Sequence, residues 1–109
     1  MKIVFSPQSR IDLHEICNYV ERVLCNPAAA DKIAEQVITS AHRLVEQPLL
    51  GFSLQSKIGR ETEHHCLISG NYGIIYRAFE TKIRVYRILD MRTDYIRAVL
   101  DVADEDGDF

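Results

Sequence analysis

The stretch from Cys66 to Arg92 constrains the fold of this chain more than any other part of the sequence. A short apolar run ends at Gly70-Asn71, and two runs rich in Val, Ile, Tyr and Phe follow it, Tyr72 to Phe79 and Lys82 to Leu89. β-Branched and aromatic residues favour strands, and Gly, Asn and Thr mark the turns between them. The pattern predicts a three-strand antiparallel meander whose first strand runs from His64 to Ile68.

A two-residue turn at Glu80-Thr81 would decide which residues face each other across the last two strands. In that register one side of the sheet is apolar apart from Arg87, so we expect it to pack on the rest of the protein. It carries Tyr72, Ile74, Tyr76, Ala78, Ile83, Val85, Arg87 and Leu89. The other side carries Gly73, Ile75, Arg77, Phe79, Lys82, Arg84, Tyr86 and Ile88. A three-residue loop with a bulge would instead swap the faces of one strand.

Arg77 lies directly opposite Arg84 in this register. Like charges that face each other destabilise a sheet unless an anion or a partner relieves the repulsion. We therefore expect the second side of the sheet to be an exposed surface that contacts another molecule.

Length and composition indicate a single soluble domain over residues 1–100. The chain has 109 residues, 47% of them apolar and 27% charged. No apolar run approaches the ~20 residues that a membrane span needs, and the N-terminus lacks a signal-peptide pattern. These features predict a cytoplasmic protein with no membrane partner. The three cysteines, with no CxxC spacing, are expected to be reduced and packed as small apolar groups.

The net charge of −3 hides a division along the chain. The last nine residues hold five acids and no base, whereas residues 1–100 hold 13 basic against 11 acidic residues. Residues 101–109 have little to bury, so we expect a flexible acidic tail; the alternative is a tail that screens the basic face of the sheet. The mildly basic remainder permits an anionic partner without requiring one, because nucleic-acid modules are usually far more basic.

The first half of the chain predicts a strand and two helices. Lys2 to Phe5 reads as a short strand, and Ser6-Pro7 supplies a helix cap and a first helical residue. Apolar residues then recur at helical spacing. Asn26-Pro27 repeats the start signal, and Pro48 and Gly51 end the second helix. The two helices form an αα-hairpin that covers the apolar side of the sheet.

The remaining segments complete an α+β fold. Gly51 to Glu63 shows no clear period and is expected to be a loop. Thr93 is placed to cap a short C-terminal helical segment that ends at Leu100. Three arginines near the sheet also have a structural alternative. Arg77 would pair with Glu63 or Asp90, and Arg92 with Asp94. Arg87 would extend past the helices to solvent or pair with Asp90 or Asp94.

Several strings, taken in order, resemble the RelE/ParE superfamily of toxins from bacterial type II toxin–antitoxin systems. SPQSRIDLHEICNYV is similar to the opening S-P-x-A-x-x-D-L-x-x-I-x-x-Y, with Ser9 where alanine is usual. Pro48 to Gly51 is similar to P-x-x-G, and Asn71 to Arg77 to n-Y-x-x-x-Y-R. IRVYRILDMR with Asp94 is similar to i-x-V-x-R-V-L-x-x-R-x-D. The resemblance covers residues 3 to about 97.

The resemblance leans towards the ParE side, whose members poison DNA gyrase by binding its cleaved-DNA complex. It implies a cognate antitoxin as partner, whose C-terminal segment wraps the helices and augments a sheet edge. It also implies DNA gyrase as target. The residues expected to contact partners are Arg77, Arg84, Tyr86, Arg92 and Tyr95.

The alternative is a RelE-like endoribonuclease that cuts mRNA on the ribosome. His64, Arg77 and Arg92 would then supply the proton transfer and the phosphate contacts. The set that such enzymes use is eroded here, because Gly73 replaces an arginine and Val99 stands near a position where a catalytic tyrosine is usual. The chain has no phosphate-cradling glycine loop and no metal-ligand spacing, so we expect neither a cofactor nor a metal.

Overall fold

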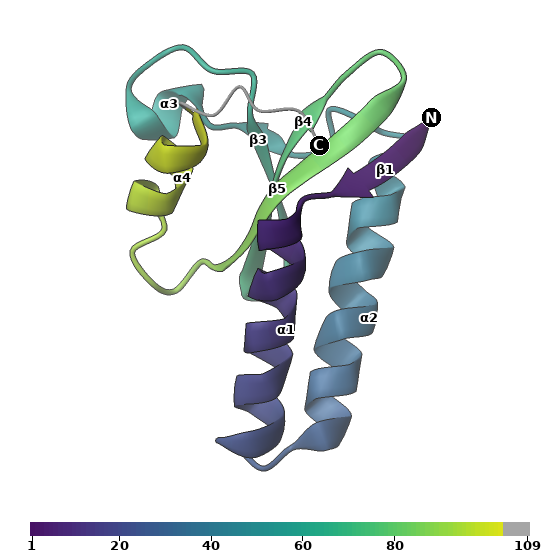
Figure 1. The fold of residues 1–109 in the computed structure, drawn as a ribbon. Coiled ribbons are helices and arrows are strands. Elements are labelled where there is room, and N and C mark those ends of the chain that lie inside the picture. The colour runs from purple at the N-terminus through teal and green to yellow at the C-terminus, as the bar shows by residue number, and fades with distance from the viewer. Residues whose placement is uncertain (104–109) are drawn as a thin grey trace.

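The computed structural model describes residues 1–103, which form a five-stranded sheet between two pairs of helices (Figure 1). In chain order the elements are β1 (Lys2–Phe5), α1 (Pro7–Arg22), α2 (Pro27–Arg43), β2 (Phe52–Ser53), α3 (Gln55–Ile58), β3 (His65–Ser69), β4 (Tyr72–Ala78), β5 (Lys82–Asp90) and α4 (Ile96–Ala103). The long α1–α2 hairpin runs along one side of the sheet, and α3 and α4 lie together on the other (Figure 1). The predicted α+β class is confirmed.

Both long helices begin where the sequence predicts. The Ser6 side chain accepts a hydrogen bond from the Ser9 amide at 3.0 Å, and Pro7 follows as the first helical residue. The Asn26 side chain accepts one from the Ala29 amide at 3.1 Å, again with a proline next. A side-chain acceptor at this position satisfies one of the amides that a helix start leaves without an intrahelical partner.

The strands are arranged in the order β1-β5-β4-β3-β2. The β3–β4–β5 meander is confirmed, and β1 adds to its edge by pairing in parallel with β5. Near the β4–β5 turn the predicted register holds, with Arg77 opposite Arg84. Farther along, Tyr76 pairs with Val85 but Ile75 pairs with Arg87, so Tyr86 forms a β-bulge.

The bulge corrects the predicted faces for the end of β5. An extra residue in one strand reverses the side to which the following side chains point. Ile88 therefore packs in the cluster under the α1–α2 hairpin, and Leu89 packs on the opposite side. The sequence pattern predicted the reverse for both residues, because it placed no bulge within this strand.

Two apolar clusters lie on the two sides of the sheet. The first, between the sheet and the long hairpin, contains Val37, Ala41, Leu44, Leu67, Tyr72, Ile74, Tyr76, Ile83, Val85 and Ile88. The second, which we call the α4 cluster, contains Leu54, Cys66, Ile75, Tyr86, Val99 and Val102. The second side is therefore covered over much of its area, and the prediction that it is open to a partner is wrong there. Val99 and Val102 are three residues apart in α4, a spacing that places both on one helix face.

The segment predicted to be a loop contains β2 and α3. Both are too short to show a period in the sequence. Its start is tied to the sheet, since the Tyr76 hydroxyl donates to the Pro48 carbonyl at 2.8 Å and accepts from the Gly51 amide at 3.0 Å. Gly51 leaves no room for a side chain, because a Cβ there would lie 2.5 Å from the Cys66 carbonyl oxygen.

The C-terminal helix extends beyond the predicted domain boundary. α4 continues past Leu100 to Ala103, and Val102 is buried in the α4 cluster. Residues 101–103 thus belong to a helix, and the rest of the predicted acidic tail, residues 104–109, lies outside the described residues.

A partly buried ion pair joins α1 to β5 next to the bulge. Arg87 Nε donates to Asp12 Oδ2 at 2.7 Å and its NH2 group to Oδ1 at 3.1 Å, so the expected pairing of Arg87 with Asp90 or Asp94 is wrong. Asp12 Oδ2 also accepts the Ile88 amide at 3.0 Å. The Asp12 carboxylate therefore binds both the Arg87 guanidinium and the Ile88 amide of β5.

Replacing Asp12 with alanine is expected to lower the free energy of unfolding by about 3 kcal/mol. The change leaves a partly buried guanidinium and a buried amide without their acceptor. Urea denaturation followed by circular dichroism at pH 7 measures the effect. Glu15→Ala, an exposed carboxylate one turn along α1, is the matched control and is expected to cost under about 0.5 kcal/mol. Equal losses for the two variants would contradict the structural role of Asp12.

Candidate functional site

The residues predicted to contact partners lie at two separate ends of the β4–β5 pair. Arg77 faces Arg84 near the turn, whereas Tyr72 faces Asp90 at the other end. Five residues of strand separate the two places, which is about 17 Å. Arg92 follows directly after the far end, so Arg77 and Arg92 do not form one site.

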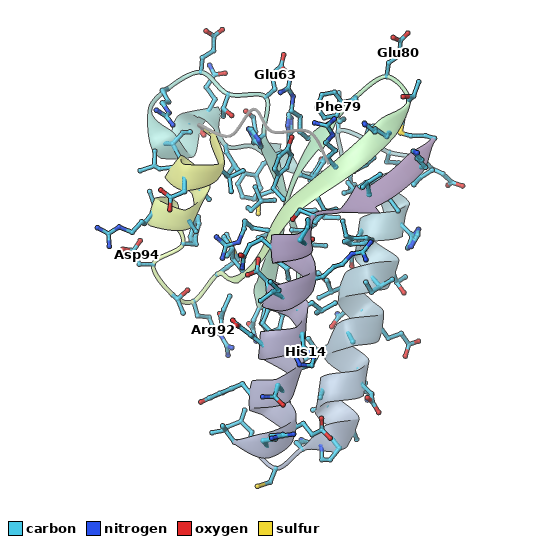
Figure 2. All side chains as sticks on the ribbon, in the orientation of Figure 1. His14, Glu63, Phe79, Glu80, Arg92 and Asp94 are labelled. Atoms are coloured by element: carbon cyan, nitrogen blue, oxygen red, sulfur yellow. The ribbon has the colours of Figure 1, made fainter. Side chains whose placement is uncertain are left out.

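We call the first place the hairpin cluster, defined by Glu63, Arg77, Phe79 and Arg84. The Cζ atoms of both arginines lie 4.6 Å from the centroid of the same Phe79 ring. The Arg77 guanidinium also donates to the Glu63 carboxylate, which was one of the two acids expected for it. Figure 2 labels Glu63 and Phe79 at the end of the sheet away from the tip of the helical hairpin. Cation–π contact with a shared ring lets two like charges occupy facing positions.

His64 and Tyr86 lie beside this cluster and are buried. Their ring centroids are 4.7 Å apart in an edge-to-face arrangement, and each side chain is 4% exposed. The His64 Nδ1 atom lies 2.9 Å from the Thr62 hydroxyl. Tyr86 was expected on an open surface, but in this structure its ring is part of the α4 cluster.

At the far end Arg92 pairs with Asp90 and not with Asp94 as expected. The Arg92 guanidinium donates to Asp90 at 3.0 and 2.8 Å, and the Arg92 amide donates to the same carboxylate at 2.9 Å. These hydrogen bonds hold the pKa of Asp90 below its usual value. Tyr95, the other residue predicted here, is half-buried against the α4 cluster.

An apolar groove opens beside Arg92, between the C-terminal half of α1 and the ends of β4 and β5. It consists of two adjoining hollows of about 310 and 290 Å³, which share Val20, Leu24, Tyr72 and Arg92. We call it the α1 groove. Leu24, in its wall, is 57% exposed.

The sequence did not indicate the α1 groove. Leu24 continues the helical spacing of the apolar residues in α1, a pattern that is typical of core positions. The signal that it is a surface residue is its place after the last turn of α1, which ends at Arg22 beyond the edge of the sheet (Figure 1).

The positions that a RelE-like nuclease would use are filled by apolar packing. A Cβ added at Gly73 would lie 2.4 Å from the sulfur of Met91 and 3.0 Å from that of Cys66. Cys66 and Val99 are buried in the α4 cluster. The side chains of Met91 and Cys66 therefore occupy the space next to Gly73 that an arginine at this position would need.

Residues 1–103 offer neither a metal-binding cluster nor a membrane-spanning helix. Within this range no group of three or more His, Cys, Asp or Glu side chains could hold a metal ion. No helix among the same residues is long and apolar enough to cross a membrane.

The fold matches a solved structure described as the chromosomal ParDE TA system from P. aeruginosa. A chain of that structure superposes with a TM-score of 0.67 at 19% sequence identity, and the match covers 81% of this chain and 92% of that one. At this identity the likeness concerns the fold alone. Among curated protein sequences, none matches this chain.

The sequence itself matches the family described as the ParE toxin of the type II toxin–antitoxin system parDE, over residues 3–95. The match spans most of the chain, so this protein belongs to the ParE toxin family. The predicted resemblance, including its lean towards the ParE side, is confirmed.

The thiols are expected to differ sharply in reactivity. Burial raises the pKa of the Cys66 thiol to about 12, whereas Cys25 is exposed. Because the thiolate is the reactive form, Ellman's reagent at pH 8 should modify Cys25 rapidly and Cys66 only after unfolding. In the Cys25→Ser variant the rapid phase should disappear. Modification of Cys66 in the native protein as fast as that of Cys25 would contradict the packing of Cys66 under Met91.

Proposed function

We propose that this protein is the toxin of a type II toxin–antitoxin module, that it inhibits DNA gyrase by binding to the cleaved-DNA complex, and that a cognate antitoxin neutralises it in the cytoplasm. The observation that carries the proposal is membership of the ParE toxin family over residues 3–95. The filled face around Gly73 supports inhibition by binding in place of RNA cleavage.

The endoribonuclease alternative receives no support from the geometry. RNA cleavage through the 2′-hydroxyl needs proton-transfer groups and cations around one phosphate. His64 is buried against Tyr86, and Arg92 pairs with Asp90 at the far end of the sheet from Arg77. The three residues that the alternative needs are therefore not gathered around one accessible point.

Gyrase inhibition is proposed to use the hairpin cluster. Arg77 is the more accessible of the two arginines in this cluster, with a side chain 29% exposed, whereas Arg84 is 9% exposed. The same proposal assigns Arg92 and Tyr95 to the edge of the contact, next to α4. Tyr86 would act from beneath, by holding His64 and the strand in place.

Purified protein incubated with gyrase, ATP and plasmid is expected to accumulate cleaved DNA linked to gyrase. Arg77→Gln should raise the concentration needed for half-maximal cleavage about tenfold, since hydrogen bonds to charged groups are worth about 1.5–3 kcal/mol. Arg43→Gln, an exposed arginine at the end of α2, is the control and should leave that concentration unchanged. If the wild-type protein gives no cleaved complex at any concentration, gyrase is not its target.

The antitoxin is proposed to bind the α1 groove. The groove joins exposed apolar side chains to the exposed Arg92 guanidinium, so it fits an amphipathic segment with aliphatic residues on one face and an acid beside them. Tyr19 and Leu24 are the most exposed large apolar residues on its rim, with exposed fractions of 55% and 57%.

Leu24→Ala is expected to weaken the complex with the antitoxin about tenfold, because it removes an apolar side chain that would be buried on binding. Leu49→Ala, which truncates a leucine that is 74% exposed and lies outside the groove, is the control. Titration of the antitoxin encoded beside this gene, followed by calorimetry, measures both. Unchanged affinity for Leu24→Ala with a loss for Leu49→Ala would place the antitoxin elsewhere.

A further inference from the structure

We propose that Arg77, backed by Arg84, binds a backbone phosphate of double-stranded DNA, and that Glu63 occupies this place in the free protein as an internal competitor. The inference deepens the proposed function and rests on it for one point, that DNA held by gyrase is the source of the phosphate.

The two arginines form a built cationic site. They face each other across β4 and β5, and each guanidinium carbon lies 4.6 Å from the Phe79 centroid, so the charges are separated by no more than twice that distance. Two cations at facing positions attract an anion more strongly than either does alone. The shared ring also restricts the rotamers of both side chains, which lowers the entropic cost of binding an anion there.

Glu63 already places one negative charge on this site. Its carboxylate accepts from the Arg77 guanidinium, yet its side chain is 73% exposed. Residues 60–64 between α3 and β3 have no helix or strand. Glu63 can therefore leave Arg77 without breaking a backbone ladder, and an exposed ion pair of this kind is worth only about 0.2–1 kcal/mol. The contact is weak enough for another anion to displace it.

A phosphodiester fits the exchange better than a second carboxylate does. A carboxylate from a partner protein would replace the Arg77–Glu63 ion pair with an equivalent ion pair, so the net gain in binding free energy would be small. A guanidinium pairs with phosphate through two parallel hydrogen bonds, as it does with a carboxylate. Binding to DNA additionally releases condensed counterions, a gain that no isolated carboxylate provides. Figure 2 shows Glu63 and Phe79 at the outer end of the sheet, with Glu80 nearby at the β4–β5 turn.

The test measures binding of the full chain to a fluorescent DNA duplex by anisotropy across a salt series. Glu63→Gln removes the competing charge and should tighten binding about two- to fivefold at low salt, with a log–log salt slope steeper by about 0.9. Glu61→Gln makes the same change in net charge from an exposed position in the same segment and should alter affinity less than twofold. Urea denaturation confirms that both variants are folded.

Three outcomes would overturn the inference. One is equal affinity for Glu63→Gln and Glu61→Gln. Another is an increase in DNA affinity in Glu63→Gln that persists when Arg77→Gln is added, because the inference attributes this increase to Arg77. The third is binding of Glu63→Gln to the duplex that inorganic phosphate does not weaken. Competition by inorganic phosphate at millimolar concentration is expected, because the recognised group is the phosphate itself.

The gyrase assay separates this inference from the proposed function. Cleaved complexes with wild-type protein but no Arg77-dependent DNA binding would leave gyrase inhibition standing and remove the phosphate site. Arg77-dependent DNA binding in Glu63→Gln without cleaved complexes would support the phosphate site and contradict gyrase inhibition.

Discussion

The fold depends on how the first turns of α1 complete the edge of β5. The parallel pairing of β1 with β5 ends at Phe5, next to the bulge, and the strand continues without that neighbour. Ser6 takes over, with its amide donating to the Val85 carbonyl at 2.9 Å and its hydroxyl to the Tyr86 carbonyl at 2.8 Å. Asp12 then accepts the Ile88 amide. Buried backbone groups need such partners, so the helix start and the bulge stabilise each other.

This junction also determines which residues reach each side of the sheet. The bulge at Tyr86 reverses the side of the sheet to which the later side chains of β5 point. Ile88 therefore packs under the α1–α2 hairpin, and Leu89 packs against the α4 cluster. The reversal supplies apolar surface to both clusters from one strand. Covering the second side in this way leaves the hairpin cluster at the free end of the sheet as the accessible cationic part.

Local signals in the sequence predicted the helix starts, the meander and the pairing of Arg77 with Arg84 correctly. Each depends on neighbouring residues, such as a cap followed by proline or two runs joined by a short turn. The bulge at Tyr86 could not be predicted, because it depends on Asp12 and Ser6, more than 70 positions away in the chain. Asp12 and Arg87 both lie in strings that resemble the superfamily, but only the structure shows that they bind each other.

The same limit applies to the candidate site. The sequence identified Arg77 and Arg84 as a pair that needs an anion, and named Glu63 as one possible acid. It also predicted an open face, since nothing in α4 alone reveals that Val99 and Val102 bury Tyr86. The spacing of these two valines was visible, but the surface that they cover lies on a strand more than ten residues earlier.

Native-state hydrogen exchange of the Ile88 amide tests the central claim most directly. If Asp12 completes the edge of β5, this amide should be protected to nearly the same degree as the paired amides of β4 and β5. In Asp12→Ala it should lose more protection than amides on the far strand β3. Exchange of the Ile88 amide in the wild-type protein at the rate of an exposed amide would contradict the claim.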